Sequence, residues 1–325
     1  MRYDAILVCV LFIIGGCALP GGPCTDAPTG AGAVATDAGA MYVNTQDPFQ
    51  TGPLTVKTLA LAACEQGAPV ELLVHAPTEG GVYPAILFIH GFVLNNSSYN
   101  GMLRQVASHG FVVVAPQDYM PGPLGAFLAP SFEQEATTAV AVLDWMDAKL
   151  ASVAGVQVDT TRLGIAGHSR GGKIAWLVTR DHPARIKAVA GVDPVDGRGD
   201  ADAAQRVAAT PLTYAAPSLA IGCAKSGSCA PTGDNHVQFY AASPSPAWHV
   251  VALDYGHGDM LDDDAPDIGL VTAVCFSNPD REPMRRLAAG LLTAHFRAAL
   301  QGDASATVYL TDAAVMPARV EIESK

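Results

Sequence analysis

Near the middle of the chain the sequence reads Gly167-His168-Ser169-Arg170-Gly171-Gly172. A strand pattern at 162–166, apolar after Arg162, precedes it, and a helical pattern over 171–180 follows. A G-x-S-x-G pattern between a strand and a helix predicts a nucleophile elbow, a strained turn that exposes a serine hydroxyl. A glycine-rich structural turn is the alternative, but it does not account for the position between strand and helix. We therefore expect Ser169 to be a nucleophile at a helix N-terminus, where backbone N–H groups favour negative charge.

The sequence on both sides of this motif alternates between strand and helix patterns. Continuous apolar runs indicate buried strands, alternation at 55–61 and 70–75 indicates the strands of a hairpin, and apolar residues at helical spacing indicate helices. The expected strands are Thr55–Leu61, Val70–His75, Pro84–His90, Phe111–Ala115, Arg162–Ala166, Ile186–Val192, Ser218–Gly222 and Trp248–Asp254, and the expected helices are Tyr99–His109, 132–150, Gly171–Arg180 and Met284–Leu300. This alternation predicts an α/β protein with the α/β-hydrolase fold, a mostly parallel sheet of about eight strands with helices on both faces.

The composition agrees with one catalytic domain of this size. The chain has 325 residues, of which 50% are apolar and 15% charged, so it has enough apolar side chains for a large core. Its 19 Lys and Arg residues against 31 Asp and Glu residues give a net charge of −12. So acidic a chain argues against nucleic acid and anionic membrane surfaces as partners.

The N-terminus has the layout of a secretory signal. A short basic start at Arg2 is followed by an apolar run at 5–14 and by small residues. A buried N-terminal strand is the alternative, but nothing upstream would pair with it. No Lys or Arg occurs between Arg2 and Lys57, which disfavours a plastid transit peptide. The expected organisation is a signal-like segment at 1–22, a Gly/Ala/Pro-rich linker at 23–53, a catalytic domain at 54–302 and a C-terminal tail at 303–325.

The seven cysteines do not suggest a metal site. Two of them lie within the signal-like segment, and the remaining odd number leaves at least one thiol unpaired in the chain. Cys223 and Cys229 would close a short loop and are the expected disulfide in an oxidising compartment. Because no Cys or His spacing is typical of zinc, we expect no metal and no other cofactor.

A serine nucleophile needs a histidine base, which in this fold comes after the nucleophile and the acid in the chain. His257 lies between two glycines in Asp254-Tyr-Gly-His-Gly-Asp259, directly after the last expected strand. That loop is where a mobile imidazole belongs, so His257 is the predicted base. His249 lies inside the strand and is interpreted as a core histidine.

The acid that orients this histidine has two candidates on the residues alone. Asp193 follows the strand Ile186–Val192, at the edge of the sheet where ligands bind in open α/β folds. Asp234 is the candidate if the acid comes one strand later, as it does in many hydrolases of this fold. Asp254 is interpreted as the end of its strand.

Two backbone N–H groups are expected to form the oxyanion hole. One belongs to Arg170, the residue after the nucleophile, and the other lies in the loop after the strand Pro84–His90. That loop reads Gly91-Phe92-Val93-Leu94. Phe92 is the predicted donor because Gly91 lets the backbone turn before it.

Several segments together resemble one family, the chlorophyllases of plants and green algae. The similar segments are Gly167–Lys173, His90–Phe92, Val106–Gln117, Gly191–Gly197, Cys229–Thr232, Asn235–His236 and Asp254–Asp264, which span roughly residues 54–300. The triad of this family falls on Ser169, Asp193 and His257, which decides the acid in favour of Asp193. Around the elbow the chain is also similar to platelet-activating-factor acetylhydrolases.

The resemblance implies a function and a set of partners. It implies serine-triad hydrolysis of the phytyl ester of chlorophyll to chlorophyllide and phytol, through an acyl-enzyme and without an enzyme-bound metal, since any Mg²⁺ belongs to the pigment. It also implies a chloroplast location and peripheral association with pigment-bearing membranes. A general carboxylesterase or lipase with the same triad is the first alternative. A non-catalytic pigment or lipid carrier is the second, against which the intact triad argues.

A phytyl ester combines a flat ring with a long apolar tail, so its site needs apolar walls. Two loops at the expected carboxyl edge of the sheet are candidates. One is Phe92-Val93-Leu94, and the other is the uncharged segment Met120–Leu128, which includes Met120, Leu124 and Phe127. The alternative for the second loop is packing on its own domain, since apolar residues are common on surfaces. We expect these residues to bind the pigment, because exposed apolar patches often mark binding sites.

Overall fold

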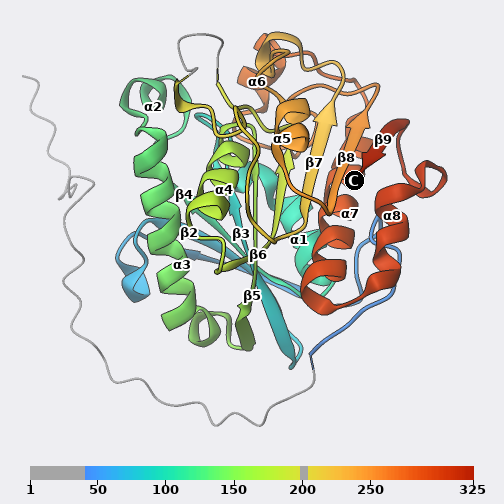
Figure 1. Ribbon diagram of the computed structural model, residues 1–325. Coiled ribbons are helices and arrows are strands. Elements are labelled where there is room, and N and C mark those ends of the chain that lie inside the picture. The colour runs from blue at the N-terminus through green and yellow to red at the C-terminus, as the bar shows by residue number, and fades with distance from the viewer. Residues whose placement is uncertain (1–40, 198–203) are drawn as a thin grey trace, which may run out of the picture.

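The structure is a computed structural model that describes residues 41–197 and 204–325 (Figure 1). One sheet of nine strands runs through the described part of the chain, in the order β1-β2-β4-β3-β5-β6-β7-β8-β9. The strands are β1 Val56–Leu61, β2 Glu71–Pro77, β3 Val82–Ile89, β4 Val112–Gln117, β5 Gln157–His168, β6 Ile186–Val192, β7 Ser218–Cys223, β8 Ala247–Ala252 and β9 Val320–Ser324. The signal-like segment at 1–22 and the linker as far as residue 40 lie outside the described residues.

The strands from β4 to β8 in this order run parallel, whereas β1, β2 and β9 form antiparallel pairs at the two edges. The eight strands expected from the sequence are all present, with ends that differ by a few residues. The predicted α/β-hydrolase fold with a mostly parallel sheet is confirmed. Because parallel strands point the same way, β4, β5, β6 and β8 all deliver the residues that follow them to one edge of the sheet.

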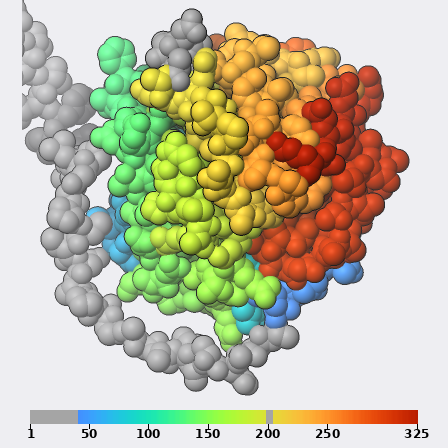
Figure 2. All heavy atoms as spheres, in the orientation of Figure 1, coloured from blue at the N-terminus to red at the C-terminus, as the bar shows by residue number. Residues whose placement is uncertain are grey.

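The ninth strand comes from the segment expected to be a tail. Residues 303–325 contain the short helix α8 (Val308–Thr311) and β9, which pairs antiparallel with β8. In β9 only Val320 and Ile322 are apolar, and they alternate with glutamates, as in a strand with one buried face. Figure 2 shows the dark red C-terminal residues lying against the orange surface of the domain. The C-terminal segment is therefore part of the fold.

Helices cover both faces of the sheet. On one face α1 and α7 pack into an apolar cluster with the strands, and on the other face α3, α4 and α5 form a second cluster. The helices are α1 Asn100–Ser108, α2 Gly122–Leu128, α3 Phe132–Ala154, α4 Arg170–Asp181, α5 His236–Ala242, α6 Ile268–Val274 and α7 Glu282–Phe296. Ser131 and Gln134 form a capping box at the start of α3, which fixes where this helix begins.

The described end of the expected linker also packs on the domain. Phe49 is 2% exposed, its carbonyl accepts a hydrogen bond from Arg286 Nε at 3.2 Å, and its ring meets Tyr309 edge to face. This part of the chain therefore contributes to the core, although its composition is typical of a linker. No helix among the described residues is long and apolar enough to span a membrane.

The expected disulfide between Cys223 and Cys229 is wrong. Cys229 pairs with Cys275, with 5.9 Å between their Cα atoms, and Cys223 keeps a free buried thiol among the described cysteines. The physical reason is that Cys223 is the last residue of β7 and faces the core, whereas Cys229 lies at the surface opposite the end of α6. The disulfide joins the segment after β7 to the residue that follows α6.

Candidate active site

Ser169 lies in a tight turn between β5 and α4, with the unusual backbone angles φ 54° and ψ −121°. A Cβ atom on Gly167 would come within 2.3 Å of the Gly171 backbone, and one on Gly171 within 2.2 Å of the carbonyl oxygen of Ile89. No larger side chain fits at either position without moving backbone. The predicted elbow is therefore present, and its glycines make the strained serine conformation accessible.

His257 reaches this serine from the loop after β8. Its Nε2 atom lies 2.8 Å from Ser169 Oγ. The loop is held by the Asp259 carboxylate, which accepts hydrogen bonds from the N–H of Gly256 at 2.8 Å and of Asn278 at 3.1 Å. The imidazole is therefore fixed within hydrogen-bonding reach of the hydroxyl, as a general base requires.

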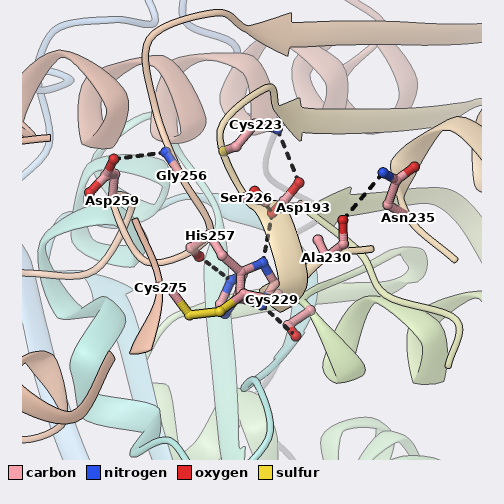
Figure 3. A network of polar contacts seen from close by, with 12 residues as sticks. Asp193, Cys223, Ser226, Cys229, Ala230, Asn235, Gly256, His257, Asp259 and Cys275 are labelled. Atoms are coloured by element: carbon pink, nitrogen blue, oxygen red, sulfur yellow. Dashed lines mark hydrogen bonds and ion pairs between the residues drawn. A yellow bond between two sulfur atoms is a disulfide. The ribbon is translucent and has the colours of Figure 1, made fainter. Parts of the chain in front are cut away.

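Asp193 follows β6 directly and lies on the other side of the imidazole (Figure 3). Its Oδ2 atom is 2.7 Å from His257 Nδ1 and accepts the Ser226 hydroxyl at 2.5 Å, while Oδ1 accepts the N–H of Cys223 at 3.0 Å. Burial by itself would raise the pKa of Asp193, but the hydrogen bond and charge of His257, with Ser226, outweigh it and hold the pKa below its ordinary value. Asp193 is therefore ionised, and the proton on His257 belongs on Nδ1.

The other sequence candidates lie apart from this arrangement. Asp234 pairs with Arg206 at 2.5 Å, and Asp254 lies within 3.9 Å of Lys225. His249 contacts His236 at 2.7 Å inside the domain, as expected for a core histidine. Ser169, His257 and Asp193 are thus the residues that the fold brings into one hydrogen-bonded line.

Sequence reasoning missed the residues that support this line. Ser226 adds a donor to the Asp193 carboxylate, and Asp259 holds the His257 loop. Ser226 lies between the two cysteines of the wrongly expected disulfide, where nothing in the local sequence indicates a contact with Asp193. Asp259 ends the quoted Asp254–Asp259 segment, so its nearness to His257 in the chain was the available signal.

The two expected oxyanion donors are backbone N–H groups in the segments that follow β5 and β3, which are neighbouring strands of the sheet. Arg170 is the first residue of α4, and the first N–H groups of a helix have no partner within that helix. The loop that carries Phe92 follows β3, the neighbour of β5 in the sheet. In this loop Val93 has φ 56°, a strained value for a β-branched residue, and its N–H donates to Tyr119 Oη at 3.4 Å. Use of the Phe92 and Arg170 N–H groups in catalysis stays a prediction.

The segment from Met120 to Pro130 contains a helix, α2, where the sequence suggested a loop. The first residue of this helix, Gly122, donates its N–H to the Val93 carbonyl at 2.8 Å. At the other end of the segment the Pro130 carbonyl accepts Arg170 Nη2 at 2.6 Å. The segment is therefore attached at one end to the Phe92 loop and at the other to Arg170, the two places expected to form the oxyanion hole.

Besides Ser226 and Asp259, sequence reasoning also missed the Arg170 side chain. Its Nε donates to Glu135 of α3 at 2.8 Å. The guanidinium also lies 4.2 Å from the centre of the Phe132 ring and 5.4 Å from that of Phe92. The motif predicts a role only for the backbone of this residue, yet the side chain links the elbow to the α2 segment.

The α2 segment exposes large apolar side chains. Met120 is 52% exposed, Leu124 60% and Phe127 93%, and the segment stands out at the upper left of the surface in Figure 2. Phe92 and Val93 are partly buried, whereas Leu94 is 5% exposed and packs in the core. Leu94 therefore offers no surface to a ligand, unlike the other residues expected to bind substrate. Among residues 41–197 and 204–325, no group of three His, Cys, Asp or Glu side chains is arranged to hold a metal ion.

Over most of its length the chain matches proteins of one family. A family model for chlorophyllases matches residues 44–324. Chlorophyllase-2 of Arabidopsis thaliana is 34% identical to this chain, over 78% of the chain and 85% of the relative. Chlorophyllase-1 of the same plant is 32% identical, over 86% and 92%. A Citrus unshiu protein named Chlorophyllase-1, chloroplastic, is 32% identical, over 81% and 82%.

Proposed function

This chain belongs to the chlorophyllase family and is a carboxylic ester hydrolase, and on that premise we propose that it hydrolyses the phytyl ester of chlorophyll to chlorophyllide and phytol. The observation that carries the proposal is the hydrogen-bonded line of Ser169, His257 and Asp193, with contacts of 2.8 and 2.7 Å. A nucleophile, a base and an orienting acid in this geometry are the elements of acyl transfer to serine.

In the proposed mechanism Ser169 Oγ attacks the ester carbonyl carbon while its proton passes to His257 Nε2. Asp193 stabilises the imidazolium that forms, and the N–H groups of Phe92 and Arg170 bind the oxyanion. The tetrahedral intermediate expels the phytyl oxygen, which takes the proton from His257 and leaves as phytol. Water then attacks the acyl-enzyme with His257 as base, which releases chlorophyllide and restores the serine.

The apolar α2 segment supports a substrate of this kind. We assign it to the phytyl tail and the pigment ring because it is exposed, uncharged and attached to both places where the oxyanion donors are predicted. Each methylene buried contributes about 0.8 kcal/mol before ordering costs. Ten methylenes would therefore contribute about 8 kcal/mol, so partial burial of the tail is enough to bind substrate and still release product.

Replacing two exposed residues of α2 tests this assignment. Leu124→Ser with Phe127→Ser should raise KM for chlorophyll at least severalfold, because it removes apolar contact area without touching the triad. Hydrolysis of a short, soluble ester should change little. Steady-state kinetics on both substrates measures the difference.

A matched control is available across the sheet from α2, in and beside α8 (Figure 1). Val308 and Val315 are 45% and 41% exposed, and their replacement by serine removes apolar surface away from the α2 segment. This control should leave KM for both substrates unchanged. Equal loss on both substrates in the α2 variant would mean that the segment supports the fold, and the binding role would be withdrawn.

The proposed reaction itself is tested by comparing chlorophyll with a series of short acyl esters. We expect chlorophyllide release with a higher kcat/KM than for the short esters. Turnover of short esters without chlorophyllide release would indicate a general carboxylesterase or lipase with the same triad. Binding of pigment without any ester cleavage would indicate a carrier.

We propose that the protein acts in the chloroplast, at pigment-bearing membranes. The Citrus unshiu relative carries the word chloroplastic in its name, and the proposed substrate resides in membranes. The exposed α2 residues would allow peripheral contact with a lipid surface. Fractionation of chloroplasts, with the protein found in the membrane fraction and released by mild washing, is the expected result.

A further inference from the structure

A second series of hydrogen bonds, through Tyr99 and His168, lies beside the Ser169–His257–Asp193 triad and is not part of it. The N–H of Gly91 donates to Tyr99 Oη at 3.0 Å. Tyr99 Oη lies 2.8 Å from His168 Nδ1, and His168 Nε2 lies 2.8 Å from the carbonyl oxygen of His257. Tyr99 and His168 are 0% and 1% exposed, so these contacts do not compete with water.

The direction of each hydrogen bond follows from the donors and acceptors. Because the Gly91 amide donates to Tyr99 Oη, the tyrosine hydrogen is available for His168 Nδ1, which accepts it. His168 then carries its proton on Nε2 and donates it to the His257 carbonyl. The opposite tautomer would turn the Nε2 lone pair toward that carbonyl oxygen, and the hydrogen bond to the His257 loop would be lost.

The protonation state of His168 agrees with this assignment. Burial lowers the pKa of His168 to about 3, and the nearby His257 contributes to the same decrease. The imidazole is therefore neutral at any pH at which the enzyme would work. Its ring centre lies 4.7 Å from that of His257, so a charged His168 would oppose the protonation of His257 during the reaction.

These hydrogen bonds connect the loop that carries Phe92 with the loop that carries His257. Gly91 precedes Phe92, the predicted oxyanion donor, and His257 is the predicted base. His168 is the last residue of β5, immediately before Ser169. One buried side chain next to the nucleophile therefore contacts the base loop directly and the oxyanion loop through a single hydroxyl.

We propose that His168 is a positioning residue for ester hydrolysis, which aligns the His257 loop and, through Tyr99, the Phe92 loop relative to Ser169. This inference rests on the proposed catalytic roles of Ser169, His257 and Phe92. It assigns to His168 and Tyr99 a part in turnover that a merely well-packed core pair would not have.

The test uses kinetics on a short, soluble ester, so that pigment binding does not enter. His168→Leu should lower kcat about 100-fold with KM within about threefold, because misplacement by about 1 Å has an effect of that size on turnover. His168→Gln, which can still donate to the His257 carbonyl, should recover most of the loss. Tyr99→Phe should lower kcat about tenfold or more on the same reasoning.

The double variant separates a connected chain from two independent residues. If His168 and Tyr99 act as one unit, His168→Leu with Tyr99→Phe should be no slower than His168→Leu alone within about threefold. Multiplicative losses would overturn the connection between the two loops.

The matched control is His109, another buried histidine with two hydrogen bonds. It is 0% exposed and contacts Asn44 Nδ2 at 2.7 Å and the Gln50 carbonyl at 2.9 Å. His109→Leu should lower the thermal midpoint about as much as His168→Leu while kcat per folded molecule stays within twofold.

Two results would overturn the proposal. One is a kcat for His168→Leu that falls only in proportion to the folded fraction. The other applies if that variant does not fold: Tyr99→Phe, which removes the hydrogen bond to His168 Nδ1, would then retain kcat within twofold of the wild type. A wild-type protein that cleaves no ester would instead overturn the proposed function itself, and the two failures are therefore distinguishable.

Discussion

Ser169→Ala should lower ester turnover by about 10⁶-fold, the loss that accompanies removal of the nucleophile in serine hydrolases of this design. The variant should fold normally, because Gly167 and Gly171, whose missing Cβ atoms make room for the elbow, remain in place. Steady-state hydrolysis of a short ester gives the rate, and thermal unfolding followed by circular dichroism checks the fold.

Ser152→Ala is the control for this experiment. The Ser152 hydroxyl lies on the exposed face of α3 and donates to the Lys149 carbonyl of its own helix, at 2.8 Å. Its removal should leave turnover unchanged. Activity of Ser169→Ala within tenfold of the wild type would contradict the assignment of Ser169 as nucleophile.

The second large effect concerns the acid. Asp193→Asn should lower kcat about 10⁴-fold, because an amide facing His257 Nδ1 favours the wrong imidazole tautomer. The amide would also have to replace a carboxylate that accepts three hydrogen bonds, from His257, Ser226 and Cys223. Rates on a short ester should fall with little change in KM, since the carboxylate is buried behind the imidazole and offers no contact to the substrate.

Two aspartates provide the comparison. Asp234→Asn weakens an ion pair with Arg206, and Asp254→Asn weakens contacts with Lys225 and Arg319. Asp234 and Asp254 both lie apart from the triad. Each substitution should therefore reduce kcat by less than about tenfold, far less than Asp193→Asn does. If Asp234→Asn lowers kcat far more than Asp193→Asn does, the acid lies after the later strand and Asp193 is misassigned.

The sheet could be predicted from the sequence wherever both faces of a strand are buried. Val82–Ile89 and Ile186–Val192 consist almost wholly of apolar residues, a pattern typical of strands covered by helices on both sides. The strand Val320–Ser324 escaped prediction because it has two apolar residues and gains its stability from pairing with β8. The helix α2 was not predicted because its two glycines and its proline lower the local preference for helix.

The places of Ser169 and His257 were predictable because each lies in a short motif whose physics is local. The carboxylate beside His257 was not, since Asp193 and Asp234 both follow strands, and only the resemblance to a family separated them. In the structure they differ by their partners, His257 for the first and Arg206 for the second. Disulfide pairing and the contacts of His168 depend on segments far apart in the chain, which no local pattern encodes.

The most direct test of the account is a titration of the purified protein with a fluorophosphonate while chlorophyllide release from chlorophyll is followed. We expect one adduct per chain, located on Ser169 by mass spectrometry, and a loss of chlorophyllide release in proportion to the labelled fraction. Chlorophyllide release that continues undiminished when Ser169 is fully labelled would contradict this expectation, as would a failure of the active protein to react at Ser169.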